Sequence, residues 1–230
     1  MNGVWAGLDC QMIYGPFLRA QPPLPAPQLP GARVWRRARA CSSVSPMLEL
    51  PELTPEHFEI LVTRELRKIG LDVSELHAQR RSMLPEPEQG YLLELKGVVR
   101  GTGWQRRVLI ACRRQQRNIA AAEVELLREH VQEAKVEAGL LFGAADFDPS
   151  ALTAAEDNPL ALLRVTDGRT AFDMSGWGTP GHYPAWLPVY CAQSVARDAL
   201  GQPQYRLLES GQAGVIAERL RTPINERREA

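Results

Sequence analysis

The chain has 230 residues, of which 44% are hydrophobic and 23% are charged, and its 27 basic side chains equal its 27 acidic ones. This length suffices for one domain with a buried core and attached segments, whereas two full domains would be cramped. Because the net charge is zero, no global field draws the protein to nucleic acid or to anionic lipid. Any electrostatic site must therefore be local.

The cysteines and the apolar segments bear on the compartment of the protein. The four cysteines are far apart, and none forms a pair at metal-ligand spacing, so we expect no zinc site. The chain has no run of about 18 apolar residues, which argues against a membrane-spanning helix. Its start lacks the features of a secretory signal. We therefore expect a soluble, cytoplasmic protein.

Residues 1–46 differ in composition from the rest of the chain. They hold seven of the eighteen prolines, several arginines and a single acid, Asp9. This composition predicts a disordered leader that cannot offset the entropy of ordering. An arginine-rich targeting segment or a basic nucleic-acid arm is the alternative, and Met47 could equally be the first residue translated.

Residues 51–172 carry the periodic patterns of a folded domain. Thr54 is a good N-cap, and apolar residues then recur at three-and-four spacing up to Gly70, which predicts a helix between them. Two apolar segments flank a Gly-Thr-Gly turn, which predicts a hairpin of two strands. These strands are residues 90–99 and 106–112.

The second half of this domain alternates helices and strands. Helical periodicity covers residues 119–138, and an apolar strand follows over residues 139–144. A short helix capped by Asp148 and a strand over residues 160–165 complete the pattern. We therefore expect an α/β fold with a layered core, in which helices flank a mixed sheet and the strands around each crossover helix are parallel.

Residues 174–230 form an extension with an irregular pattern, whose role the sequence does not assign. A helix is predicted over residues 189–200. The aromatic residues of the extension could stack on nucleic-acid bases, but aromatic residues beside prolines more often pack an extension onto the core. They are Trp177, Tyr183, Trp186 and Tyr190.

Five segments carry a family resemblance, namely FEILVTRELRKIG, VLIACRR, EVELLREHV, GLLFGAADFDPSAL and LLRVTDG. In this order they resemble the Mrr-type restriction endonucleases of the PD-(D/E)xK superfamily, over about half of the chain. The resemblance implies a restriction-endonuclease-like fold, DNA as the partner, and phosphodiester hydrolysis with Mg²⁺ or Mn²⁺ held by carboxylates. A homodimer would suit the cutting of two strands.

The resemblance also assigns catalytic positions, and there the sequence departs from the family. The Gln/Glu-x-Lys motif falls on Ala111-Cys112-Arg113, and the aspartate falls on Leu92 when counted from Gly90. Alanine and leucine cannot ligate a metal ion. Arginine keeps the positive charge of lysine but is not interchangeable with it. We therefore expect a DNA-binding protein that is catalytically degenerate.

Glu94 and Lys96 allow an alternative interpretation. Because side chains alternate along a strand, both project from one face, and Glu94-Leu95-Lys96 repeats the carboxylate-x-lysine pattern one strand early. The protein would then be an active endonuclease, with Glu94 as metal ligand, Lys96 as charge stabiliser, and Glu123 or Glu125 assisting. The simpler interpretation is a solvated strand face with neighbouring opposite charges.

The charges around the second strand predict contact with phosphate. Between Glu94 and Glu123 the sequence has seven basic residues and no acidic one. This predicts a local basic patch suited to the DNA backbone, although a run of charges can also be only a solubilising surface. The predicted phosphate ligands are Arg106, Arg107, Arg113, Arg114 and Arg117.

A third interpretation belongs to another class of protein. The fold could serve as a protein-binding scaffold through its aromatic extension, without binding DNA. The two classes differ in one measurable property, because only a protein that contacts phosphates has an affinity for DNA that falls as salt rises.

Overall fold

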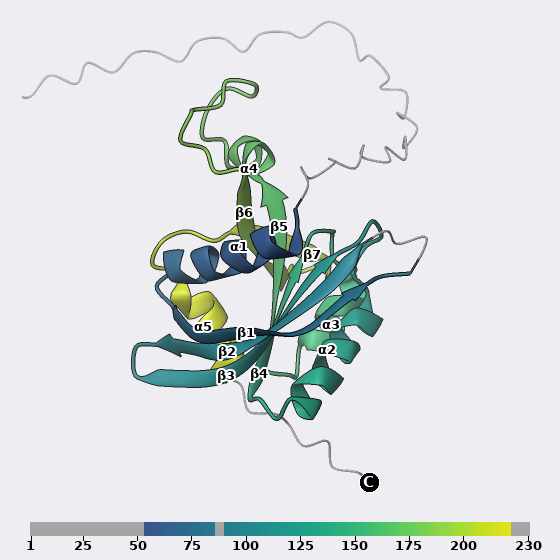
Figure 1. Ribbon diagram of the computed structural model, residues 1–230. Helices are drawn as coiled ribbons and strands as arrows, with labels where there is room; N and C mark the ends of the chain where they lie inside the picture. The colour runs from purple at the N-terminus through teal and green to yellow at the C-terminus, as the bar shows by residue number, and fades with distance from the viewer. Residues whose placement is uncertain (1–52, 86–89, 222–230) are drawn as a thin grey trace, which may run out of the picture. The chain divides into compact units, whose positions relative to one another are not determined.

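The computed structural model describes residues 53–85 and 90–221 (Figure 1). The predicted leader over residues 1–46 lies outside the described residues. Within the described part of the chain, no helix is both long enough and apolar enough to cross a membrane.

One mixed sheet of seven strands organises the domain, and the strands lie side by side in chain order. β3 pairs in parallel with β4, and β4 with β5, while the other pairs are antiparallel. The expected α/β fold with a mixed sheet is therefore confirmed. The strands are β1 (Asp72–Met83), β2 (Tyr91–Gly101), β3 (Trp104–Arg114), β4 (Ala138–Gly143), β5 (Leu160–Asp167), β6 (Tyr190–Arg197) and β7 (Pro203–Leu207).

Helices cover both faces of the sheet and enclose two apolar layers (Figure 1). Leu61 of α1 and Ile216 of α5 pack in the same layer as Leu140. Val124 of α2 packs in the other layer with Leu141. Successive residues of the central strands thus supply opposite layers, as strand geometry requires. The helices are α1 (Pro55–Lys68), α2 (Ala121–Glu133), α3 (Pro149–Ala155), α4 (Gly168–Ser175) and α5 (Ala213–Arg221).

The first helix and the hairpin form as the sequence predicts. At the start of α1, His57 N donates to the hydroxyl oxygen of Thr54 at 3.3 Å, and Gly70 follows the helix with a φ of 98°. β2 and β3 pair continuously from the turn, where Gly101 lies opposite Trp104. This short turn sets the register of the hairpin, so it determines which side chains of β2 and β3 are neighbours.

Two details at helix ends differ from the predictions. α2 ends at Glu133 rather than near residue 138, because Lys135 adopts a φ of 53° and β4 begins at Ala138. Asp148 does occupy the N-cap position of α3, but its carboxylate accepts from Asn118 Nδ2 at 3.0 Å and makes no side-chain hydrogen bond to the helix. Asp148 therefore ties the loop before α2 to the loop before α3.

The polar segment over residues 72–83 forms β1, a strand that the sequence pattern does not predict. β1 is an edge strand and most of its side chains are exposed, so it lacks a clear alternation of apolar and polar residues. Its pairing with β2 is also irregular between Ser74 and His77 and between Ala78 and Arg80. Such irregularities interrupt the period of two on which strand prediction depends.

The helix predicted over residues 189–200 is wrong, because residues 190–197 form β6. The four residues from Cys191 to Ser194 are all buried. A strand covered on both faces has no alternation of apolar and polar residues, which explains the error. β6 pairs with β5, and β7 pairs with β6, so this part of the extension belongs to the same sheet as the preceding strands.

A buried carboxylate joins α1 to the sheet. Glu65 is 1% exposed, and its oxygens lie 2.9 Å from Arg64 Nη2 and 2.5 Å from Lys68 Nζ. The backbone N–H of Ala192, in β6, donates to Glu65 Oε2 at 3.1 Å. Because a buried charge requires such partners, Glu65 holds α1 in a defined position on β6.

We predict that Glu65→Ala lowers the free energy of unfolding by about 2 kcal/mol, because it removes charge-assisted hydrogen bonds that are partly shielded from water. Urea denaturation followed by circular dichroism measures this change. Glu59→Ala, in the same helix, is the matched control and should change stability much less. Equal losses in the two variants would contradict the role of Glu65.

Candidate functional site

The positions that the resemblance assigns to catalysis lie side by side on the face of the sheet that packs against α2. In the register of the hairpin, Leu92 is opposite Arg113 and Glu94 is opposite Ala111. Leu92 and Ala111 both belong to the apolar layer under α2. Cys112 points to the opposite layer, where burial raises the pKa of its thiol. Two of the positions that the resemblance assigns to catalysis therefore carry apolar side chains in a buried layer.

Arg113 and Glu123 form the central contact of the site. Glu123 lies in the first turn of α2, and its carboxylate accepts from Ala120 N at 2.9 Å. Its Oε1 lies 3.5 Å from Arg113 Nη2 and 2.7 Å from Arg117 Nη2. The side chains of Glu123 and Arg113 are only 2% and 8% exposed. Two guanidinium groups thus neutralise one buried carboxylate.

The Gln115 side chain forms hydrogen bonds that hold Arg113 in position for this ion pair. Its side-chain oxygen accepts a hydrogen bond from Arg113 Nε. Its amide nitrogen donates to the carbonyl oxygens of Arg117 and Asn118 at 2.9 and 3.1 Å. The orientation of the Arg113 guanidinium is therefore fixed by both a charged and a neutral partner.

The residues at this site do not fit a divalent metal ion. Mg²⁺ and Mn²⁺ require several oxygen ligands, usually carboxylates, whereas Leu92 and Ala111 offer none. Glu123 is already bound by Arg113 and Arg117, whose positive charges would repel a metal ion. Among residues 53–85 and 90–221, no group of three or more His, Cys, Asp or Glu side chains is arranged to hold a metal.

Glu94 and Lys96, the candidate catalytic pair of the alternative interpretation, contact different partners. Glu94 is 2% exposed, with one oxygen 2.5 Å from His130 Nδ1 and the other 3.5 Å from Arg80 Nε. Lys96 Nζ donates to the carbonyl oxygen of Ala134 at 2.9 Å, just after α2 ends. That contact is favourable because a cation stabilises the negative end of a helix dipole.

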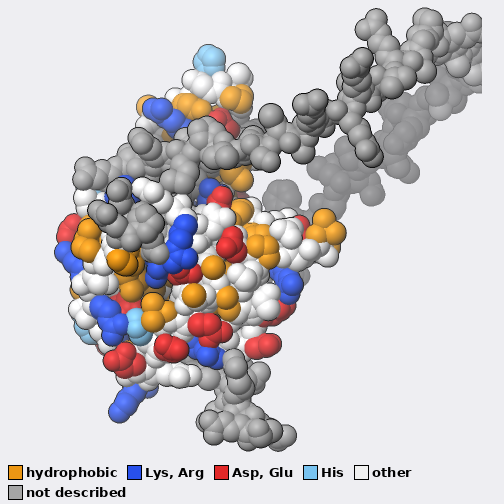
Figure 2. All heavy atoms as spheres, turned by 90° about the vertical axis from the view of Figure 1, so that its right-hand side faces the viewer, with side chains coloured by type: hydrophobic (Ala, Val, Ile, Leu, Met, Phe, Trp, Pro, Cys, Tyr) orange, Lys and Arg blue, Asp and Glu red, His pale blue; other side chains and the backbone are white. Residues whose placement is uncertain are grey.

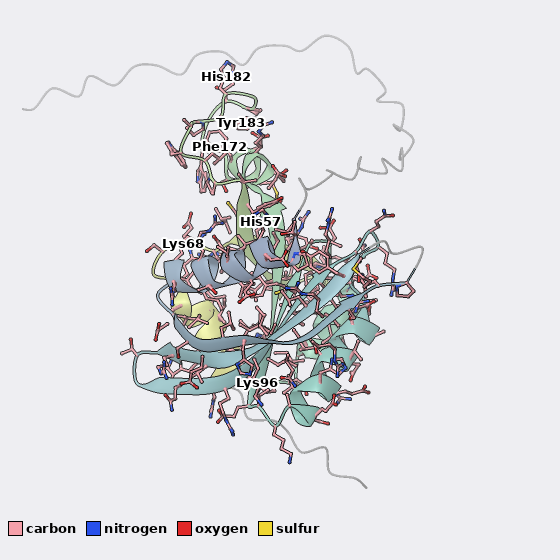
Figure 3. The ribbon with its side chains drawn as sticks, viewed as in Figure 1. His57, Lys68, Lys96, Phe172, His182 and Tyr183 are labelled. Atoms are coloured by element: carbon pink, nitrogen blue, oxygen red, sulfur yellow. The ribbon has the colours of Figure 1, made fainter. Side chains whose placement is uncertain are left out.

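The assisting acids of the alternative have partners of their own. Glu125 lies 2.6 Å from Arg128 on the surface of α2, and Glu123 is held as described above. Figure 3 shows Lys96 on the lower part of the sheet. Both Glu94 and Lys96 therefore have contacts that connect the sheet to α2, in place of the solvated strand face of the simpler interpretation.

The five predicted phosphate ligands form two groups rather than one patch. Arg106 and Arg107 lie near the start of β3, whereas Arg113, Arg114 and Arg117 lie at or beyond its end. Arg113 follows Arg106 by seven positions along an extended strand, which corresponds to about 23 Å. The two groups therefore lie at opposite ends of the strand.

Acidic residues from other elements neutralise much of the basic segment. Glu137, just before β4, lies 3.2 Å from Arg106 and 3.8 Å from Arg107. Arg100 lies 3.5 Å from Asp72 and 3.6 Å from Glu75, at the start of β1. Figure 2 accordingly shows basic and acidic side chains interspersed on the face that it presents.

The carboxyl ends of the parallel strands hold a further arginine that the sequence analysis did not single out. Gly143 of β4 pairs with Arg113 on one side and with Arg164 on the other. The guanidinium of Arg164 lies 2.9 Å from Asp146 and 4.7 Å from the centre of the Tyr205 ring. The only local signal for it is a charged residue inside the apolar segment LALLRV.

Arg114 lies on the other face of β3, near the first residue of β6. Burial raises the pKa of Tyr190, and the positive charge of Arg114 acts on this tyrosine in the opposite direction. Arg64 of α1 donates to the carbonyl oxygen of Tyr190 at 2.5 Å. Two guanidinium groups from distant parts of the sequence therefore meet at the start of β6.

Comparison with known proteins identifies a family for most of the folded domain. A family model described as a restriction endonuclease, that of the Mrr catalytic domain, matches residues 50–170, which is more than half of the chain. This range contains the strands from β1 to β5 and the helices from α1 to α3. No curated protein and no solved structure matched the chain.

We predict that Arg113→Ala lowers the free energy of unfolding by about 3 kcal/mol, because removing one partner of a buried ion pair leaves the other charge poorly compensated. Urea denaturation measures the loss. Arg107→Ala is the matched control on the same strand, where an exposed guanidinium should contribute less than about 1 kcal/mol. A loss no larger than that of the control would mean that Arg117 alone compensates Glu123.

Proposed function

Because the chain belongs to the Mrr-type restriction endonuclease family, we propose that it binds DNA and that it has lost metal-dependent cleavage. The observation that carries this proposal is the buried contact of Arg113 with Glu123, because the resemblance assigns the position of Arg113 to the family's catalytic lysine. A guanidinium remains protonated at all physiological pH values. It therefore supplies a permanent positive charge at the site but neither activates water nor leaves room for an ion that could.

Arg114 and Arg117 are the residues of the predicted set that best suit DNA contact. Arg117 is 53% exposed although it also pairs with Glu123, and a guanidinium has enough donors to serve a carboxylate and a phosphate together. Arg114 is partly exposed, and among the described residues no ion pair neutralises it. Arg113 is buried, so its role in the proposal is to hold Glu123 and Arg117 in place.

Arg106 and Arg107 lie at the opposite end of β3 and share Glu137. They provide a matched comparison, because they come from the same strand and carry the same charge. We infer that the phosphate contacts lie at the end of β3 next to Arg113, whereas Arg106 and Arg107 serve only in surface ion pairs.

We predict that the full chain binds a fluorescein-labelled 20-base-pair duplex with an affinity that falls as salt rises. The double variant Arg114→Ala/Arg117→Ala should weaken binding and lower the slope of log K against log salt by about 2, because each phosphate contact contributes about 0.9. Fluorescence anisotropy titrations between 50 and 200 mM salt, values chosen to span the usual sensitive range, measure both quantities.

The control is Arg106→Ala/Arg107→Ala, which should leave the slope unchanged. If only this control variant loses DNA affinity and salt dependence, the phosphate contacts lie at the other end of β3. Absence of any salt-dependent binding by the unaltered chain would instead favour the protein-binding scaffold.

We predict that supercoiled plasmid stays intact when it is incubated with the full chain and Mg²⁺ or Mn²⁺, because the site lacks carboxylates that are free to bind a metal. Agarose electrophoresis of the plasmid, with a chelator as reference, tests this. Metal-dependent nicking that disappears in Glu94→Gln would contradict the proposal and support the endonuclease in which Glu94 and Lys96 have taken over catalysis.

A further inference from the structure

The segment between β5 and β6 forms a projecting arm. This α4 arm, residues 168–189, contains α4 and the loop that returns to the sheet, and Figure 1 shows it standing beyond the end of the strands. Its base is closed, because Gly168 N donates to Val189 O at 2.9 Å. A side chain at position 168 would approach Pro188 O to 1.8 Å, so only glycine allows this closure.

The arm has a small aromatic cluster of its own. The rings of Trp177 and Tyr183 contact Phe172 edge to face, with centroid distances of 6.1 and 5.7 Å. Figure 3 shows Phe172 and Tyr183 together in the arm. The Tyr183 hydroxyl donates to Asp173 at 2.9 Å, and the Arg169 guanidinium lies 5.3 Å from the centre of the Tyr183 ring. These contacts give the arm a defined internal structure.

Trp186 is not part of this cluster. Its side chain is 69% exposed, whereas Trp177 is 44% exposed and packs on Phe172. An exposed indole keeps a large apolar surface in contact with water, and covering that surface with a partner is favourable. Met174 and Val189 of the arm are also exposed, at 57% and 62%.

Three guanidinium groups lie near the base of the arm, where the Asp167 carboxylate caps α4 and Glu65 pairs with one of them, Arg64. Tyr190 is the residue that follows the arm. Burial raises its pKa, the charge of Arg114 acts to lower that pKa, and Arg64 donates to its carbonyl oxygen. Arg169 adds a third guanidinium at the start of α4. Trp186 precedes Tyr190 by four residues, so the arm joins an exposed aromatic ring to a base that carries guanidinium groups. Nucleic acid with unpaired bases is bound by this combination, since cations attract the backbone and a ring stacks on a base.

We propose that Trp186 stacks on an unpaired base of DNA whose backbone is bound by the arginines at the end of β3. This inference rests on the proposed function and specifies the class of DNA. In a fully paired duplex both faces of each internal base are covered by its neighbours, so an exposed indole gains no stacking partner. An unpaired base can leave the stack and offer its face to Trp186.

The test compares two labelled 20-base-pair duplexes of the same sequence, one fully paired and one with a single extra unpaired adenine. Fluorescence anisotropy with the full chain should show about tenfold tighter binding to the second duplex, a value within the usual range for stacking of one base. Trp186→Ala should abolish this preference and leave the affinity for the paired duplex within about twofold, since phosphate contacts remain.

Two further variants separate stacking from general effects. Trp186→Phe keeps an aromatic ring and should retain most of the preference. Leu200→Ala removes another exposed apolar side chain, 83% exposed in the turn between β6 and β7, and should change neither affinity. Circular dichroism spectra of all variants confirm that each is folded.

The outcomes distinguish this inference from the proposed function. Equal binding of the two duplexes by the full chain, unchanged in Trp186→Ala, would overturn the role of Trp186 while DNA binding stands. No binding of either duplex would overturn both. Self-association of the full chain in sedimentation experiments, lost in Trp186→Ala, would overturn the inference by showing that a second copy covers the indole.

Discussion

The buried contact between Arg113 and Glu123 is the interaction on which the character of the site depends. It joins the end of β3 to the first turn of α2, and Arg117 and Gln115 complete it. Burying two charges is favourable only where each has well-placed partners, and here every group of the cluster has at least one. The positive charge of Arg113 is a permanent part of the protein, in contrast to a metal ion, which can dissociate.

Two other buried carboxylates connect helices to the sheet in a similar way. Glu65 joins α1 to β6, and Glu94 joins β2 to His130 of α2. An apolar interface tolerates small shifts of a helix along a sheet, whereas a buried ion pair requires particular partners at a particular distance. We infer that these contacts, with that of Glu123, help to select one arrangement of the two helical layers.

The proposed DNA contacts lie outside this rigid centre. Arg114 and Arg117 lie at the carboxyl end of β3, and the α4 arm extends from the carboxyl end of β5, which runs parallel to β3 through β4. The arginines and the arm therefore lie at the same end of the parallel strands. The arm carries an exposed indole, and its base is closed by the hydrogen bond from Gly168 N to Val189 O.

The sequence by itself determined the elements whose signals are local. Thr54 and Gly70 bound the first helix, and the turn at Gly101 sets the hairpin register that places Arg113 opposite Leu92. Only the tertiary structure decided which arginines are neutralised. Glu137 and Asp72 pair with arginines of the segment between Glu94 and Glu123, which has no acidic residue of its own. It also decided β1 and β6, since an exposed edge and a strand buried on both faces lack the alternation that local patterns require.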